Sequence, residues 1–111
     1  MECPLLACDL EYYNALPGQE GCVVLSLIQI STEKSDYIFD CFMVRDLIRS
    51  QHGASSLRSI FADPGITKIM HGCDSDLKYL VADLGVVTIN LIDTARVFAF
   101  IQRLPRADVI V

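Results

Sequence analysis

The sequence predicts one α/β domain with a mixed β-sheet. Two observations support this: three apolar segments joined by short polar connections come first, and apolar residues at helical spacing then alternate with short apolar runs. The expected order is β-β-β-α-(α)-β-α-β-α. At 111 residues the chain suffices for a single small domain, residues 1–111, and is too short for two.

The first three segments are expected to be antiparallel strands over residues 5–11, 23–30 and 37–42. The connections NALPGQEG and STEKSD are rich in turn-forming and polar residues, and short connections of this kind join antiparallel neighbours. The middle segment, VVLSLIQI, is apolar almost throughout, as expected of a central strand covered on both faces.

The rest of the chain is expected to alternate helices with strands. Capping signals support this: serines precede LRSIFA, Gly85 follows a helical pattern, and Asp93 or Thr94 is expected to cap the last helix. That helix has a wide apolar surface, and three apolar residues close the chain, which indicates an incomplete domain. The segments are a helix near 44–48, a helix in SSLRSIFADPG, a strand at 66–72, a helix in CDSDLKYLVADLG, a strand at 86–92 and a helix in DTARVFAFIQRL.

Composition excludes several classes of protein. The formal net charge of −5 argues against a broad electrostatic grip on nucleic acid. No apolar run is long enough to span a bilayer and no basic segment typical of a signal peptide opens the chain, so an intracellular, soluble protein is expected. Five irregularly spaced cysteines predict reduced, mostly buried thiols.

Two acids, Asp9 and Glu11, follow the apolar start of the first strand. Strand residues two apart point the same way, so these carboxylates share one face, and Cys8 and Leu10 share the other. Like charges this close repel each other unless a proton or a cation such as Mg²⁺ or Mn²⁺ intervenes. Taken alone, the pair is more simply explained as the solvent-facing side of a strand. Acids make up 14 of 111 residues, so two of them on one strand are not unusual.

A second pair of acids, Asp74 and Asp76, opens the helix after the strand at 66–72. Helix N-termini favour negative charge, and Asp74 is expected to be the N-cap. Asp76 then has no capping role and can project from the strand end towards a neighbouring strand. His71 is either a hydrogen-bonded residue at the strand end or a positioning residue of the site.

Other catalytic motifs are missing from the sequence, which has no G-x-S-x-G elbow, P-loop or G-x-G-x-x-G. Two histidines without zinc-hydrolase spacing exclude that chemistry. Cys73 has no candidate base except His71. The remaining prominent acids are expected at a strand end, on a helix surface and at a cap: Asp40, Asp83 and Asp93.

The segments CDLEYYN, LSLIQIST, YIFDCF, ITKIMHGCDSDLKYLVADLG and INLIDTARVFAF occur in this order. Together they resemble the ribonuclease D branch of the DEDD exonucleases, especially its exosome-associated members, from residue 5 to about residue 100. The resemblance implies a ribonuclease H-like fold and metal-dependent hydrolysis of single-stranded RNA from its 3′ end. It also implies RNA processing or degradation, contact with RNA exosome subunits, and a nuclear or cytoplasmic location.

The resemblance also implies a site with two divalent ions, Mg²⁺ or Mn²⁺. Asp9 and Glu11 match the family's D-x-E ligands, and Asp76 matches the acid of H-G-x-x-x-D, which leaves Asp74 as a non-catalytic neighbour. The positions expected to line the pocket for the terminal nucleotide are Leu10, Tyr12 and His71.

One family motif has no match. A later Tyr-x-x-x-Asp supplies the fourth metal ligand and the tyrosine that orients the attacking water, but no tyrosine lies four residues before Asp108, the last acid. Because a missing general-base contribution costs on the order of 10²-fold in rate, the isolated chain is expected to be weak or inactive.

Three functions are therefore compared. The first is the N-terminal part of an exoribonuclease domain. The second is an inactive or truncated relative that binds RNA or protein, favoured by the missing motif and the apolar helix over 97–104. The third, an unrelated binding domain with a flavodoxin-like sheet, conflicts with the antiparallel start.

Overall fold

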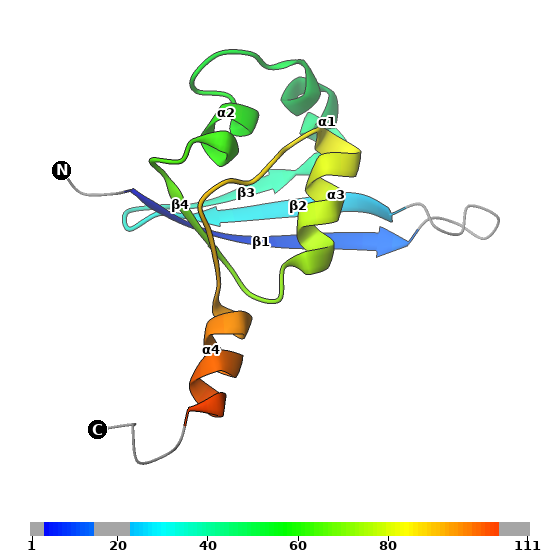
Figure 1. Ribbon diagram of the computed structural model, residues 1–111. Helices are drawn as coiled ribbons and strands as arrows, with labels where there is room; N and C mark the ends of the chain where they lie inside the picture. The colour runs from blue at the N-terminus through cyan, green and yellow to red at the C-terminus, as the bar shows by residue number, and fades with distance from the viewer. Residues whose placement is uncertain (1–3, 15–22, 105–111) are drawn as a thin grey trace.

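The computed structural model describes residues 4–14 and 23–104 (Figure 1). Most of the first expected loop and the apolar residues that close the chain lie outside this part. The described residues form a sheet in the order β3-β2-β1-β4-β5. Its strands are β1 (Leu5–Asn14), β2 (Val23–Ser31), β3 (Asp36–Asp40), β4 (Thr67–Met70) and β5 (Leu91–Asp93).

Strand directions confirm the mixed sheet. β1 pairs antiparallel with β2, and β2 pairs antiparallel with β3. β4 runs parallel to β1, and β5 runs parallel to β4. The central strand is therefore β1. The segment VVLSLIQI, expected to be a central strand, forms most of β2, which lies inside the sheet between β1 and the edge strand β3.

Four helices are described: α1 (Cys41–Ser50), α2 (Leu57–Ala62), α3 (Asp74–Leu84) and α4 (Thr94–Arg103). The serine cap of α2 is confirmed, because Ser56 accepts a hydrogen bond from the Ser59 amide. Gly85 ends α3 in the left-handed conformation, as expected. Within the described residues, no helix is long and apolar enough to cross a membrane.

Three expected strands are shorter in the structure. The strand expected at 66–72 spans only Thr67–Met70. The strand expected at 37–42 ends at Asp40, because the Asp40 carboxylate accepts from the Phe42 amide and starts α1 at Cys41. The last begins only at Leu91. Before it, Asn90 adopts a left-handed conformation with φ of 61°, which interrupts the extended backbone.

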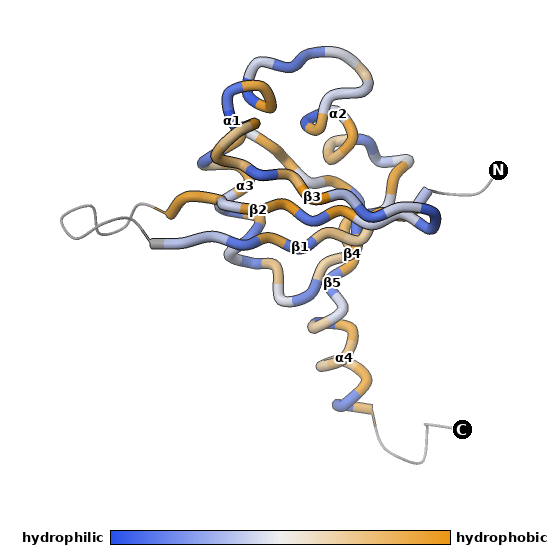
Figure 2. Tube along the Cα trace, turned by 180° about the vertical axis from the view of Figure 1, so that it is seen from behind, coloured by the Kyte–Doolittle hydropathy of each residue, from blue (hydrophilic) through white to orange (hydrophobic). Residues whose placement is uncertain are grey.

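The helices lie mainly on one face of the sheet. Figure 1 shows α3 crossing β1 and β2, with α1 and α2 beside it, while Figure 2 shows the opposite face of the sheet without helices. Helix α4 extends away from the sheet and carries exposed apolar side chains. The buried core residues are Cys8, Leu10, Leu25, Ile28, Ile30, Cys41, Ile48, Phe61, Met70, Cys73, Leu80, Leu84 and Val86.

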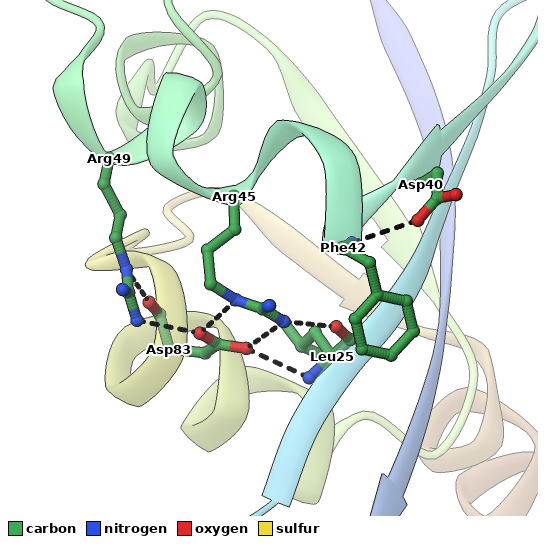
Figure 3. Close-up of polar contacts among 6 residues, drawn as sticks. All are labelled: Leu25, Asp40, Phe42, Arg45, Arg49 and Asp83. Carbon is green, nitrogen blue, oxygen red and sulfur yellow. Dashed lines mark hydrogen bonds and ion pairs between the residues drawn. The ribbon is translucent and has the colours of Figure 1, made fainter.

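A polar cluster fixes α3 against α1 and β2 (Figure 3). The Asp83 carboxylate binds Arg45 Nε at 2.8 Å, Arg49 Nη2 at 2.9 Å and the Leu25 amide at 3.0 Å. Its side chain is only 9% exposed. The expectation of a helix-surface acid was wrong, because α1 packs over this end of α3 and supplies two guanidinium groups.

Candidate active site

The acids of β1 lie on the face that the alternation predicted. Cys8 and Leu10 point into the core, whereas Asp9 and Glu11 are exposed. β4 pairs with β1 only along Leu5–Ala7. Both acids therefore follow the point where the described part of β4 stops covering that edge of β1, and the connection from β4 to α3 begins there.

Asp76 approaches these acids from the first turn of α3. Burial raises the pKa of its carboxyl above the ordinary value, and the negative charges of Asp9 and then Glu11 raise it further. The fold thus brings Asp76 close enough to Asp9 and Glu11 for their charges to act on its carboxyl, although Asp76 lies more than sixty residues away along the chain. This is the electrostatic arrangement that a bound cation relieves.

The chemistry of these donors fits a hard divalent cation, since all three are carboxylates. In the described part of the chain, however, no three His, Cys, Asp or Glu side chains are grouped tightly enough to hold a metal ion. Asp9 Oδ1 accepts from the adjacent Leu10 amide at 3.0 Å. The assignment of these three residues as metal ligands stays a prediction.

An open pocket of about 370 Å³ lies beside Asp9. It is formed where β4 and β5 end next to β1. Besides Asp9, its polar lining comes from His71 and Thr94. The remaining lining residues are Ala7, Cys8, Ile69 and Met70.

His71 is held by a hydrogen bond from the neighbouring strand end. Its Nδ1 lies 2.9 Å from Thr94 Oγ1, and the same hydroxyl donates to the Met70 carbonyl at 3.1 Å. His71 is therefore hydrogen-bonded at the strand end and also lines the pocket, and its role as a positioning residue of the site stays a prediction.

Asp93 anchors the connection that carries His71. Its Oδ1 accepts from the amides of Gly72 and Ala95, both at 2.9 Å, and its Oδ2 accepts from the Cys73 amide at 3.1 Å. The Gly72 and Cys73 amides are the main reason why the pKa of Asp93 lies well below its usual range. The expected cap role was correct but incomplete, because Asp93 also binds the loop leading into α3.

The sequence contained a signal for this second role. Parallel strands end at the same edge of a sheet, so an acid at the end of β5 faces the connection that leaves β4. The observed register pairs Met70 with Asp93. Sequence reasoning treated each strand end separately and missed the contact.

The other predicted residues of the site have different environments. Tyr12 is 42% exposed and its ring packs edge-on against Tyr79, with centroids 4.7 Å apart. The Leu10 side chain is 5% exposed and belongs to the core.

The expectation that Asp74 is the N-cap of α3 was wrong. Cys73 occupies that position, while Asp74 Oδ1 pairs with Arg96 Nη2 at 2.6 Å.

The buried thiols are poor nucleophiles. Burial raises the pKa of Cys8 to about 12, with additional repulsion from Asp76 and Asp9. Burial and the hydrogen bond to Asp93 raise the pKa of Cys73 to about 11. Because the thiolate is the reactive form, the raised pKa of Cys73 argues against cysteine-based catalysis at this residue.

The sheet order and the helices on one face of the sheet define a ribonuclease H-like α/β domain. A sequence comparison agrees: the profile of the family described as 3′-5′ exonuclease matches residues 1–107. The chain belongs to this family and, within it, to the ribonuclease D branch. Members of the family generally use divalent metal ions.

Individual relatives support this placement. The chain is 44% identical over 88 residues to the Caenorhabditis elegans exosome complex component 10 homolog, covering 79% of this chain and 9% of that protein. The catalytic core of RRP6 from Trypanosoma brucei superposes with a TM-score of 0.67 at 33% identity, covering 81% of this chain and 23% of that one. The EXD2 exonuclease domain soaked in Mn and GMP gives a TM-score of 0.64 at 29% identity, covering 90% and 47%. The chain therefore spans a small part of the curated relatives it matches.

Proposed function

We propose that this chain is the N-terminal part of a single 3′-5′ exoribonuclease domain that removes nucleotides from single-stranded RNA ends. The observation that carries the proposal is that α3 brings Asp76 near Asp9 and Glu11, whose charges add to burial in raising the pKa of Asp76. The pocket that Asp9 lines supports a place for a terminal nucleotide beside that residue.

The proposed cofactors are two divalent ions, Mg²⁺ or Mn²⁺. When bound, such ions stabilise the attacking and leaving oxygens of a phosphodiester. Asp9, Glu11 and Asp76 would hold them through carboxylate oxygens, and His71 and Tyr12 would contact the terminal nucleotide. The EXD2 exonuclease domain, which was soaked in Mn and GMP, supports a metal ion and a nucleoside monophosphate as ligands of such a domain.

The proposed partners are a single-stranded RNA 3′ end and RNA exosome subunits. The relatives described as exosome complex component 10 support an association with the exosome and a nuclear location. The net charge of −5 favours local contacts at the pocket over a broad basic surface. The alternative of a binding module without cleavage is not favoured, because residues 1–107 match an exonuclease family.

Calorimetric titration with Mn²⁺ tests the metal site directly. The 111-residue chain should bind Mn²⁺, Asp76→Asn should abolish the binding, and Asp74→Asn should leave it nearly unchanged. Asp74 is a matched control because it lies in the same helical turn but pairs with Arg96. Equal effects of the two substitutions would contradict the role of Asp76.

Cleavage is tested with a 5′-labelled single-stranded RNA and Mn²⁺. The isolated chain should be weak or inactive, and a longer polypeptide that supplies the Tyr-x-x-x-Asp motif should release nucleoside monophosphates from the 3′ end. An RNA with a blocked 3′ end should resist. If the longer polypeptide is also inactive, the proposed catalytic function is wrong.

A further inference from the structure

The Thr94 hydroxyl lies between His71 and the carbonyl of Met70. A hydroxyl has one hydrogen, and Thr94 can direct it to the Met70 carbonyl at 3.1 Å. The Thr94 oxygen is then the acceptor at its 2.9 Å contact with His71 Nδ1, where the donor and acceptor roles depend on the tautomer. This arrangement requires a proton on Nδ1, and in the neutral ring the lone pair then lies on Nε2.

Nε2 forms no hydrogen bond with any residue that the structure describes, and His71 is exposed in the wall of the pocket. The charged group of this wall, the Asp9 carboxylate, is also an acceptor. The Thr94 hydroxyl is already engaged twice. Without a bound cation, the polar groups that these side chains offer to a ligand are therefore acceptors, which favour a ligand that donates hydrogen bonds.

We infer that Thr94 holds His71 in the Nδ1-protonated form so that Nε2 accepts a hydrogen bond from a hydroxyl of the terminal sugar. This inference rests on the proposed function and adds the chemical group that the pocket recognises. Sugar hydroxyls are donors, whereas the phosphates of a nucleotide are acceptors. The 2′- and 3′-hydroxyls share this chemistry, and the second measurement below separates them.

The tautomer is measured first, independently of metal, substrate and activity. Nitrogen-15 NMR of the whole chain at pH 8 should show Nδ1 protonated and Nε2 unprotonated. Thr94→Ser, which keeps the hydroxyl, should preserve this pattern. Thr94→Val, which keeps the shape, should lose it and shift the ring towards the other tautomer. A wild-type ring protonated mainly at Nε2 overturns the inference.

The ligand is tested by titrating AMP, 2′-deoxy-AMP and 3′-deoxy-AMP in the presence of Mg²⁺, following the His71 nitrogen signals. AMP should bind more tightly than the analogue lacking the recognised hydroxyl by a factor of about 3 to 10, the value of one net hydrogen bond. His71→Ala should remove that difference.

Equal binding of all three nucleotides overturns the inference while leaving the proposed nucleotide pocket intact. Failure of all three to bind overturns the pocket itself, and with it the proposed function. Because the first failure preserves AMP binding and the second abolishes it, the two are distinguishable.

Discussion

The carboxylate of Asp93 accepts a hydrogen bond from the amide of Gly72 at 2.9 Å, joining the end of β5 to the connection that leaves β4. Gly72 has φ of 62°, in the left-handed region that favours glycine. This turn directs the chain from His71 into α3, and α3 carries Asp76 in its first turn. Asp93 is thus not one of the three predicted metal ligands, but it binds the turn that connects His71 to α3, which carries Asp76.

We expect Asp93→Asn to lower the melting temperature at neutral pH. Asparagine retains one acceptor oxygen in place of the two that bind the amides of Gly72, Cys73 and Ala95. The pKa of Asp93 is depressed, so its stabilising effect is present above the ordinary value of 3.8 and is lost as the pH falls further. Thermal denaturation from pH 7 to pH 3 should show the difference from wild type shrinking.

Asp46→Asn is the matched control for that measurement. Asp46 is an exposed acid on α1, and its replacement should change the melting temperature little at any pH. An Asp93→Asn protein as stable as the control at pH 7 would contradict the anchoring role.

Asp76→Asn should have the opposite effect on the metal-free chain. The pKa of Asp76 is raised by burial and by Asp9 and Glu11, so its ionisation opposes folding at pH 7. The variant should be as stable as wild type or more so. In wild type, the raised pKa of Asp76 stabilises the folded state at low pH, where the carboxyl is protonated, and this effect is lost as the pH rises. The stability advantage of the variant over wild type should therefore shrink as the pH falls.

The same melting experiment with Mn²⁺ checks the role of Asp76 in binding. An ion that binds only the folded chain raises its melting temperature by mass action. The rise should occur in wild type and in Asp74→Asn, but not in Asp76→Asn. A marked loss of stability in metal-free Asp76→Asn would instead show that Asp76 is a structural residue.

Asp83→Ala should cost about 3 kcal/mol of unfolding free energy, a typical value for removing one partner of a buried ion pair. The change leaves Arg45 without its carboxylate and the Leu25 amide without its acceptor (Figure 3). Chemical denaturation, with Asp46→Ala on the facing helix as the control, measures the loss. A cost as small as that of Asp46→Ala would show that the cluster contributes little.

The thiols of Cys8 and Cys73 should resist alkylation in the folded chain at pH 8. Their raised pKa values, about 12 and about 11, leave little thiolate at this pH. Peptide mass spectrometry after iodoacetamide treatment should find both thiols modified only after denaturation.

Asp93→Asn adds an internal comparison to the alkylation experiment. The Asp93 carboxylate helps to raise the pKa of Cys73 but is not among the causes of the shift at Cys8. Relative to wild type, the variant should therefore accelerate the alkylation of Cys73 more than that of Cys8. Equal acceleration at both thiols would indicate general unfolding instead.

The sequence by itself determined the local features. The alternation around Asp9 and Glu11 placed both acids on the exposed face of β1, and the caps at Ser56 and Gly85 were predicted correctly. These features depend on neighbours within a few residues, where strand periodicity and helix capping act directly. The ordered sequence motifs also indicated the family, and the alternation of segments indicated the mixed sheet.

Only the tertiary structure decided which distant residues meet. It brought Asp76 to the acids of β1, paired Asp83 with two arginines, and buried Lys68 among the carbonyls of Asp63, Ile66 and Ile89. It also joined Asp93 and Thr94 to the turn that carries His71. Such contacts depend on strand order and on helix packing across the sheet. No local pattern contains this information, because the partners lie up to 67 residues apart and meet only when the sheet has formed.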